Sequence, residues 1–111
     1  MSGEGVLRSA PANAERGEAT LLVGGRRHVL RPTFAALVAA EDELGPLLAL
    51  VERASAGQLR LSELTALFWH CLATPGGLTR EAVGEAVAEG GLAAASAPLR
   101  TLLVQILQGA P

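Results

Sequence analysis

Apolar and polar residues near the N-terminus follow the pattern of a β-hairpin. A mostly apolar run, Thr20–Val23, meets Gly24 and Gly25, and the chain then returns through Arg26–Leu30. Paired glycines supply the positive φ angles that a tight two-residue turn requires. The pattern therefore predicts a β-hairpin over residues 18–31.

Two registers of this hairpin are compatible with the sequence. A two-residue turn places Glu18 opposite Arg31, which makes a pair of opposite charges across the strands. A four-residue loop over Gly24–Arg27 would instead pair Leu22 with Val29. We expect the two-residue turn.

Beyond the hairpin, apolar residues recur at three- and four-residue intervals, which is typical of amphipathic helices. Prolines, glycines and hydroxyl caps divide this region into separate segments, with Thr33, Ser62 and Thr79 as the predicted N-caps. The predicted helices cover Phe34–Leu44, Leu47–Ala56, Glu63–Ala73, Arg80–Glu89 and a last helix that Ser96 and Pro98 open and that runs to about Leu107. Leu92–Ala95 is ambiguous, and one helical turn is an option there.

These elements predict an α+β fold that is mostly α, with an N-terminal hairpin followed by a compact bundle of four to five short helices. The chain of 111 residues has room for one domain. Residues 1–14 are small and polar with little periodicity, so they are predicted to be a disordered leader. Residues 15–108 form the single domain, and 109–111 form a short tail.

Composition limits which residue types can form the core and indicates where the protein is located. Half of the residues are apolar but only 3% are aromatic, so the core must be built from Leu, Val and Ala. The leader lacks the apolar centre of a signal peptide, and no run reaches the roughly 18 apolar residues of a membrane span. We therefore expect a soluble, cytoplasmic protein that does not enter a membrane.

The charge balance gives no reason to expect a nucleic-acid partner. The formal net charge is −2, whereas nucleic-acid-binding domains carry basic surfaces. The hairpin does hold Arg26, Arg27, His28 and Arg31, but no aromatic residue interleaves with them and alternation sends them to both faces. A solvated hairpin edge protected by charge is the favoured interpretation.

No motif for catalysis or metal binding emerges. Cys71 follows His70, but adjacent residues of a helix point about 100° apart, so the two cannot form a nucleophile–base pair readily. One Cys and two isolated His offer no ligand spacing for a metal, and neither Gly24 nor Gly76 begins a phosphate-binding loop. We expect a protein that is not an enzyme and has no cofactor and no metal.

Glu41 is unusual because it falls near the middle of an apolar helix stripe. That predicted stripe consists of Phe34, Leu37, Val38 and Leu44. Burying an unpaired carboxylate costs several kcal/mol, so Glu41 needs a partner. One interpretation is a salt bridge to an arginine of the hairpin, and the other is a polar contact across an oligomer interface.

Two apolar helix faces are candidate partner-binding surfaces. The first comprises Leu64, Leu67, Phe68 and Trp69, and the second comprises Leu99, Leu102, Leu103 and Ile106. Trp69 either completes the core or is an anchor for a partner. The last helix also carries Val104 on its far side, so it either closes the core or leaves an exposed apolar surface.

Several segments of the chain, in this order, together carry a resemblance to a known family. They are Arg16–Glu18 before the hairpin, Leu30–Leu37, Glu41–Gly45, Leu64–Trp69 followed by Leu72, and Thr79–Gly84. Together they resemble the small tail proteins of gene transfer agents and related prophages. The resemblance covers about Asn13–Leu107, which is nearly the whole predicted domain.

The resemblance implies a role in building the tail of a phage-like particle. Members of the family are described as tail assembly chaperones or as tail tube components. A tube subunit needs a large β-sheet to close a ring, and one hairpin favours the chaperone. Such a chaperone would bind apolar helices of the tape-measure protein and other tail proteins, with homo-oligomer formation as an option. A structural tail subunit is the alternative, and a small helical regulatory or interaction protein is the second alternative.

Overall fold

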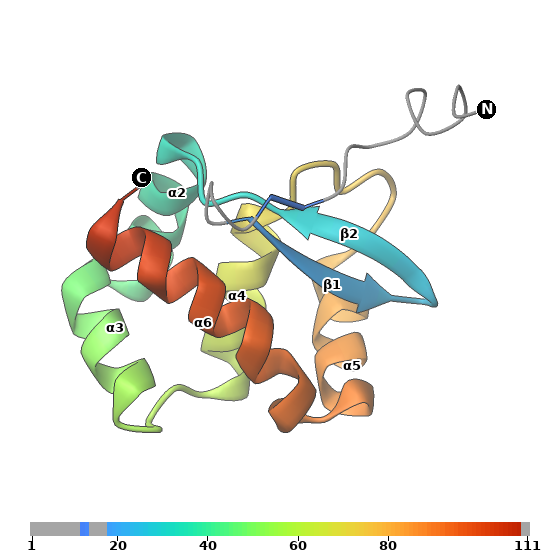
Figure 1. Cartoon of the computed structure of the whole chain (residues 1–111). Helices are drawn as coiled ribbons and strands as arrows, with labels where there is room; N and C mark the ends of the chain where they lie inside the picture. Colours follow the sequence, from blue (N-terminus) through green and yellow to red (C-terminus); the bar gives the residue numbers. More distant parts are fainter. Residues whose placement is uncertain (1–11, 14–17, 110–111) are drawn as a thin grey trace.

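The computed structural model of the chain describes residues 12–13 and 18–109, in which a two-stranded hairpin precedes five helices (Figure 1). The elements are β1 (Ala19–Val23), β2 (Arg26–Leu30), α2 (Phe34–Leu44), α3 (Leu47–Ser55), α4 (Leu61–Cys71), α5 (Arg80–Gly90) and α6 (Leu92–Gln108). The predicted fold class is confirmed. The predicted disordered leader, apart from Ala12 and Asn13, and the end of the predicted tail lie outside the described residues.

The hairpin has the predicted two-residue turn. Gly24 and Gly25 have φ angles of 60° and 78°, and Val23 pairs directly with Arg26. These positive φ angles match the right-handed twist of the strands, which is why glycine is favoured at both positions. The alternative register with a four-residue loop is excluded.

The charge pair at the open end of the hairpin is also confirmed. Arg31 Nε donates a hydrogen bond of 2.8 Å to Glu18 Oε2, and the Glu18 side chain is only 6% exposed. The second carboxylate oxygen of Glu18 accepts from the backbone N–H of Asn13 at 3.0 Å. A buried carboxylate is thus satisfied on both oxygens, as burial requires.

Hydroxyl caps explain where α2 and α5 begin. The hydroxyl groups of Thr33 and Thr79 accept from the backbone N–H groups of Ala36 and Ala82, at 3.1 and 3.0 Å, as predicted.

The predicted start of α4 is wrong. The helix begins at Leu61, with Arg60 rather than Ser62 as its N-cap. Glu63 Oε1 reaches back to the Arg60 N–H at 2.9 Å and also accepts from Arg53 Nη1 at 2.8 Å. This carboxylate fixes the helix start and ties α3 to α4, and the Arg53 guanidinium together with the Arg60 N–H holds the pKa of Glu63 at about 2.

The predicted break before Pro98 is also wrong, because α6 is continuous from Leu92 to Gln108 with Pro98 inside it. Gly91, with a φ of 87°, ends α5 and separates the two helices instead. The residues before Pro98 are mainly Ala, the best helix former, and Ala95 is buried in the core. This packing and propensity outweigh the backbone hydrogen bond that a proline removes.

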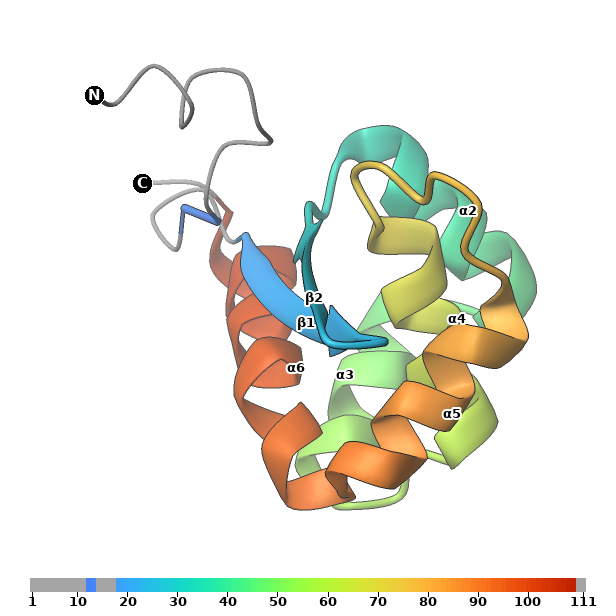
Figure 2. The ribbon, with the colours of Figure 1, turned by 90° about the vertical axis from the view of Figure 1, so that its right-hand side faces the viewer.

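Helix α4 lies at the centre of the molecule, between α2 and α5. The hairpin packs against α5 and α6 through β1, and it lies between α6 on one side and α4 and α5 on the other (Figure 2). The outer edge of β2 is tied to the end of α4, because Arg31 N–H donates to the Cys71 carbonyl and Ala73 N–H to the Val29 carbonyl. The largest fully buried side chains are Phe68, Leu30, Leu50, Leu67, Leu102, Val83 and Cys71.

Helix α2 turns a different side to the core from the one its sequence predicts. The buried residues are Ala36 and Ala40, whereas Phe34 is 85% and Val38 is 39% exposed. The other two members of the predicted stripe, Leu37 and Leu44, pack against the core from its border. Alanines allow α2 to approach α4 closely, so the favourable helix contact lies on the alanine side.

Candidate interaction surfaces

Three residues of the first predicted partner surface lie in the core. Leu64 is 7% exposed, and Leu67 and Phe68 are 0% exposed. Trp69 is partly buried and packs against the same core. A partner could reach Leu64, Leu67 and Phe68 only if the core opened, so the predicted stripe of this helix is a packing surface in the folded chain.

The second predicted surface divides between core and solvent. Leu102 is fully buried and Leu99 packs against the core, whereas Leu103 and Ile106 are partly exposed. Two further apolar residues of α6, Val104 and Leu107, are 47% and 55% exposed. The terminal helix therefore both closes the core and leaves apolar side chains at the surface.

Helical geometry shows to which side these exposed residues of α6 point. Pro98 and Thr101 line crevices next to β1, and Leu103 lies about 200° around the helix from Thr101. Leu103 and Leu107, one turn apart, therefore lie on the flank away from the hairpin, where α6 packs against α3.

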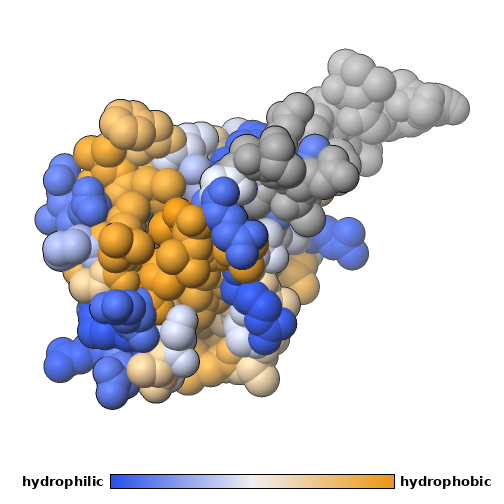
Figure 3. Space-filling view, turned by 60° about the vertical axis from the view of Figure 1, so that its left-hand side comes forward, coloured by the Kyte–Doolittle hydropathy of each residue, from blue (hydrophilic) through white to orange (hydrophobic). Residues whose placement is uncertain are grey.

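Helix α3 adds exposed apolar residues on this side of the molecule. Leu48 is 68% exposed and Leu47 is partly exposed. The face that carries α3 and the end of α6 is apolar at its centre and bordered by hydrophilic residues (Figure 3). We call the surface formed by Leu47, Leu48, Leu103 and Leu107 the α3/α6 face.

Glu41 is not buried, which corrects the predicted environment of its carboxylate. The residue is exposed, and Glu41 Oε2 accepts from the Leu47 backbone N–H at 3.1 Å, at the start of α3. No ion pair joins it to an arginine of the described hairpin. The alanine side of α2 faces the core, so Glu41 points outward and caps the next helix. A contact of Glu41 across an oligomer interface stays a prediction.

A polar cluster joins three helices that are distant in sequence. Glu43 of α2 contacts His70 of α4, with 2.8 Å between Oε1 and Nε2, and Arg80 of α5, with 2.6 Å between Oε2 and Nη1. The hydrogen bonds from Arg80 and then from His70 hold the pKa of Glu43 at about 2. No local sequence pattern indicates this cluster, because its members are 27 and 37 residues apart.

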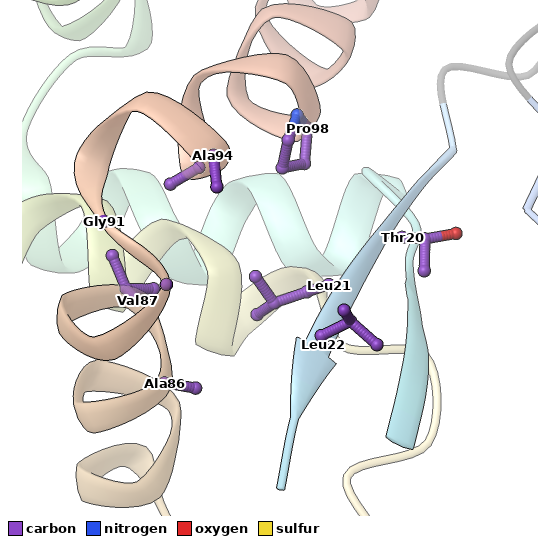
Figure 4. A pocket seen from close by; sticks show the side chains of 10 residues that line it. Thr20, Leu21, Leu22, Ala86, Val87, Gly91, Ala94 and Pro98 are labelled. Atoms are coloured by element: carbon purple, nitrogen blue, oxygen red, sulfur yellow. The ribbon is translucent and has the colours of Figure 1, made fainter. Parts of the chain in front are cut away.

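A narrow apolar crevice runs beside the outer edge of β1 (Figure 4). It has a volume of about 170 Å³ and lies between β1 and the corner where α5 meets α6. In this register the backbone groups of Thr20 and Leu22 point to this outer edge, where they have no hydrogen-bond partner among the described residues. Leu22 itself is 59% exposed. The crevice therefore borders an open strand edge.

Cys71 is a core residue, as its position predicts. It is 1% exposed, and burial raises the pKa of its thiol to about 12. Across residues 12–13 and 18–109, no three His, Cys, Asp or Glu side chains are close enough to share a metal ion. In the same ranges no single helix has the length and apolar composition of a membrane span. Helices α5 and α6 reach that length and composition only when taken together, and a bend of 118° separates them.

Comparison with known proteins assigns the chain to a family. A family model described as phage tail tube protein, GTA-gp10, matches residues 16–109, which include both strands and all five helices. No curated protein and no solved structure matches the chain. The chain therefore belongs to the GTA-gp10 family of phage tail tube proteins, with a structural or assembly role in a phage-like tail.

Proposed function

We propose that this protein is a non-enzymatic tail assembly chaperone of a gene transfer agent or prophage particle. It acts in the bacterial cytoplasm, where it binds apolar helices of the tape-measure protein before the tail tube covers them. The observation that carries the proposal is the α3/α6 face, because exposed leucines on a helical surface suit an amphipathic partner helix.

The exposed area on this face fits weak and reversible binding. Leu48 and Leu107 are 68% and 55% exposed, and complete burial of such a side chain contributes about 1.5–3 kcal/mol. Together these two leucines supply a few kcal/mol before the cost of association. Several copies bound along one long helix would cover its apolar stripe, and each copy could still be displaced individually.

A structural subunit of the finished tail is the second candidate. The family description names the tail tube, and the open edge of β1 offers Thr20 and Leu22 for pairing with a strand of a neighbouring subunit. Against this, a two-stranded hairpin is a small sheet from which to close a ring. Mass spectrometry of purified particles separates the two roles, since a chaperone would be scarce and a subunit would be stoichiometric.

Co-purification with the tape-measure protein tests the binding surface. The double variant Leu48→Gln with Leu107→Gln should lose most of the bound tape-measure protein, because two exposed leucines become polar without a change in charge. Leu22→Gln is the matched control, since Leu22 is 59% exposed and lies on the hairpin, away from the α3/α6 face. Equal recovery with the double variant and the control would overturn the assignment of this face, provided that circular dichroism shows both to be folded.

A further inference from the structure

A second surface lies in the groove between α4 and α5. Its volume is about 730 Å³, with Leu61, Ser62 and Thr65 on the α4 side and Glu81, Gly84, Glu85 and Ala88 on the α5 side. Glu43 and Arg80, already paired with each other, lie at its rim. We propose that this groove binds a basic amphipathic helix of a partner protein.

The floor of the groove offers a polar group that the fold leaves unused. Thr65 is only 7% exposed, yet its hydroxyl has no hydrogen-bond partner in the part of the chain that the structure describes. Every described side-chain oxygen or nitrogen that is sealed from solvent has a partner, so the hydroxyl must open to the groove that Thr65 lines. Water can hydrate the hydroxyl there, and a donor or acceptor on a bound segment could take the place of that water.

Gly84 makes the floor accessible. A Cβ atom at this position would lie 3.4 Å from both Cγ2 and Oγ1 of Thr65. Without a Cβ there, only backbone atoms of α5 stand beside Thr65 at this point of the groove. Because a glycine inside a helix is unfavourable relative to alanine, its place opposite Thr65 is consistent with a need for close approach.

The rim specifies the charge of the occupant. Glu81 and Glu85 are one helical turn apart on α5, both are exposed, and neither has an ion pair with a described residue. Like charges at this spacing repel each other. Arg80, on the same rim, pairs with Glu43 and with neither of these two carboxylates. A lysine or arginine of a partner would therefore find two unpaired carboxylates beside the groove.

The shape of the groove favours a helix as the occupant. Two adjacent helices form its walls, and the exposed Leu61 and Ala88 extend the apolar lining at its margins. A third helix packs into such a groove with its side chains between the two rows of residues. In Figure 2, α4 and α5 lie on the opposite side of the hairpin from α6, so this groove and the α3/α6 face can be tested separately.

Fluorescence anisotropy with a synthetic helix tests the proposal. The probe is a labelled peptide of Ala, Leu and Arg repeats with an apolar stripe flanked by arginines, and its counterpart carries Glu in place of Arg. We expect the full-length protein to bind the basic peptide at least about tenfold more tightly than the acidic one. Glu81→Arg with Glu85→Arg should weaken binding of the basic peptide by about tenfold or more.

Two further variants distinguish binding in the groove from general attraction by surface charge. Gly84→Leu keeps the charge and fills the floor, so it should also weaken binding by about tenfold or more. Glu52→Arg changes an exposed charge on α3, outside the lining of the groove, and should alter affinity by less than about twofold. Circular dichroism and thermal unfolding establish that each variant is folded.

Equal losses with Glu52→Arg and with the rim variant, or full binding by folded Gly84→Leu, would overturn the proposal. So would absence of binding by the basic peptide. Recovery of the tape-measure protein through Leu48 and Leu107 is a separate measurement, so failure of either proposal can be recognised without the other.

Discussion

Phe34 and Phe68 lie at opposite extremes of burial, at 85% and 0% exposed. Both are apolar residues at helical spacing within amphipathic segments, and their side chains are identical. They differ only in position, because Phe68 lies on the side of its helix that packs against the rest of the molecule and Phe34 does not. At the scale of a residue, stability therefore depends on burial and not on residue type.

Truncation of these two residues should have very different effects. Phe68→Ala should lower the free energy of unfolding by about 3–5 kcal/mol, because it leaves a cavity at the centre of the core. Phe34→Ala should change it by less than about 0.5 kcal/mol. Urea unfolding of both variants measures the difference, and a large loss with Phe34→Ala would contradict the position of this side chain.

At the scale of elements, the turn and the caps decide where strands and helices begin. The hairpin depends on two residues with positive φ at its turn, Gly24 and Gly25. In both cases an added Cβ would meet no neighbouring atom within 4 Å. The constraint on these residues is therefore the backbone conformation and not lack of space.

Substitution at the turn separates these two causes. Gly24→Val should lower the free energy of unfolding by about 1–2 kcal/mol, because a branched side chain disfavours the left-handed region. Gly24→Asn should cost clearly less, since asparagine tolerates that region and is common in such turns. Thermal unfolding of the two variants provides the comparison, and equal costs would show that the turn has another conformation.

Pro98 is a residue at which an element departs from local preference, because it lies inside α6. Pro98→Ala should raise the free energy of unfolding by about 1 kcal/mol or more, because it supplies an N–H for the carbonyl of Ala94 and removes the clash of the ring. Proline lines the crevices beside β1, so some packing is lost. A decrease in stability, measured by urea unfolding, would mean that this packing outweighs the backbone term.

At the scale of the whole molecule, the cluster of Glu43, His70 and Arg80 joins α2, α4 and α5. Each contact lies at the surface, where solvent weakens it. One carboxylate nevertheless receives two partners from two different helices. The cluster therefore contributes to the relative placement of the three helices around the α4/α5 groove, whose rim includes Glu43 and Arg80.

This cluster predicts a dependence of stability on acid. The pKa of Glu43 is lowered from 4.5 to about 2 in the folded chain, so the unfolded state binds more protons between these values. The free energy of unfolding should therefore fall as the pH falls from about 5 towards 2. The side chain is 39% exposed, and after screening by solvent we expect Glu43 to contribute about 1 kcal/mol or less.

Comparison of Glu43→Gln with the wild type isolates this contribution. The variant should be less stable at neutral pH and should lose less stability in the acidic window, while Glu63, which also has a pKa of about 2, maintains part of the slope. Glu85→Gln is the matched control, since Glu85 has no ion pair with a described residue. Identical pH profiles for the wild type and Glu43→Gln would contradict the cluster.

The amino-acid sequence alone determined the hairpin, its register, most helix boundaries and the charge pair of Glu18 with Arg31. These features depend on turn conformation, hydroxyl caps and residue spacing, which act over a few residues or across one turn. The sequence also carried the family resemblance, which the match over residues 16–109 confirmed.

Only the tertiary structure decided which helix faces are buried and which groups from distant segments meet. It turned the alanines of α2 to the core and exposed Phe34, because close approach of two helices can outweigh the burial of one large side chain. It placed Leu64, Leu67 and Phe68 inside, and it brought Glu43, His70 and Arg80 together. Packing is a property of pairs of elements, so the groove between α4 and α5 and the α3/α6 face have no signature in any single helix.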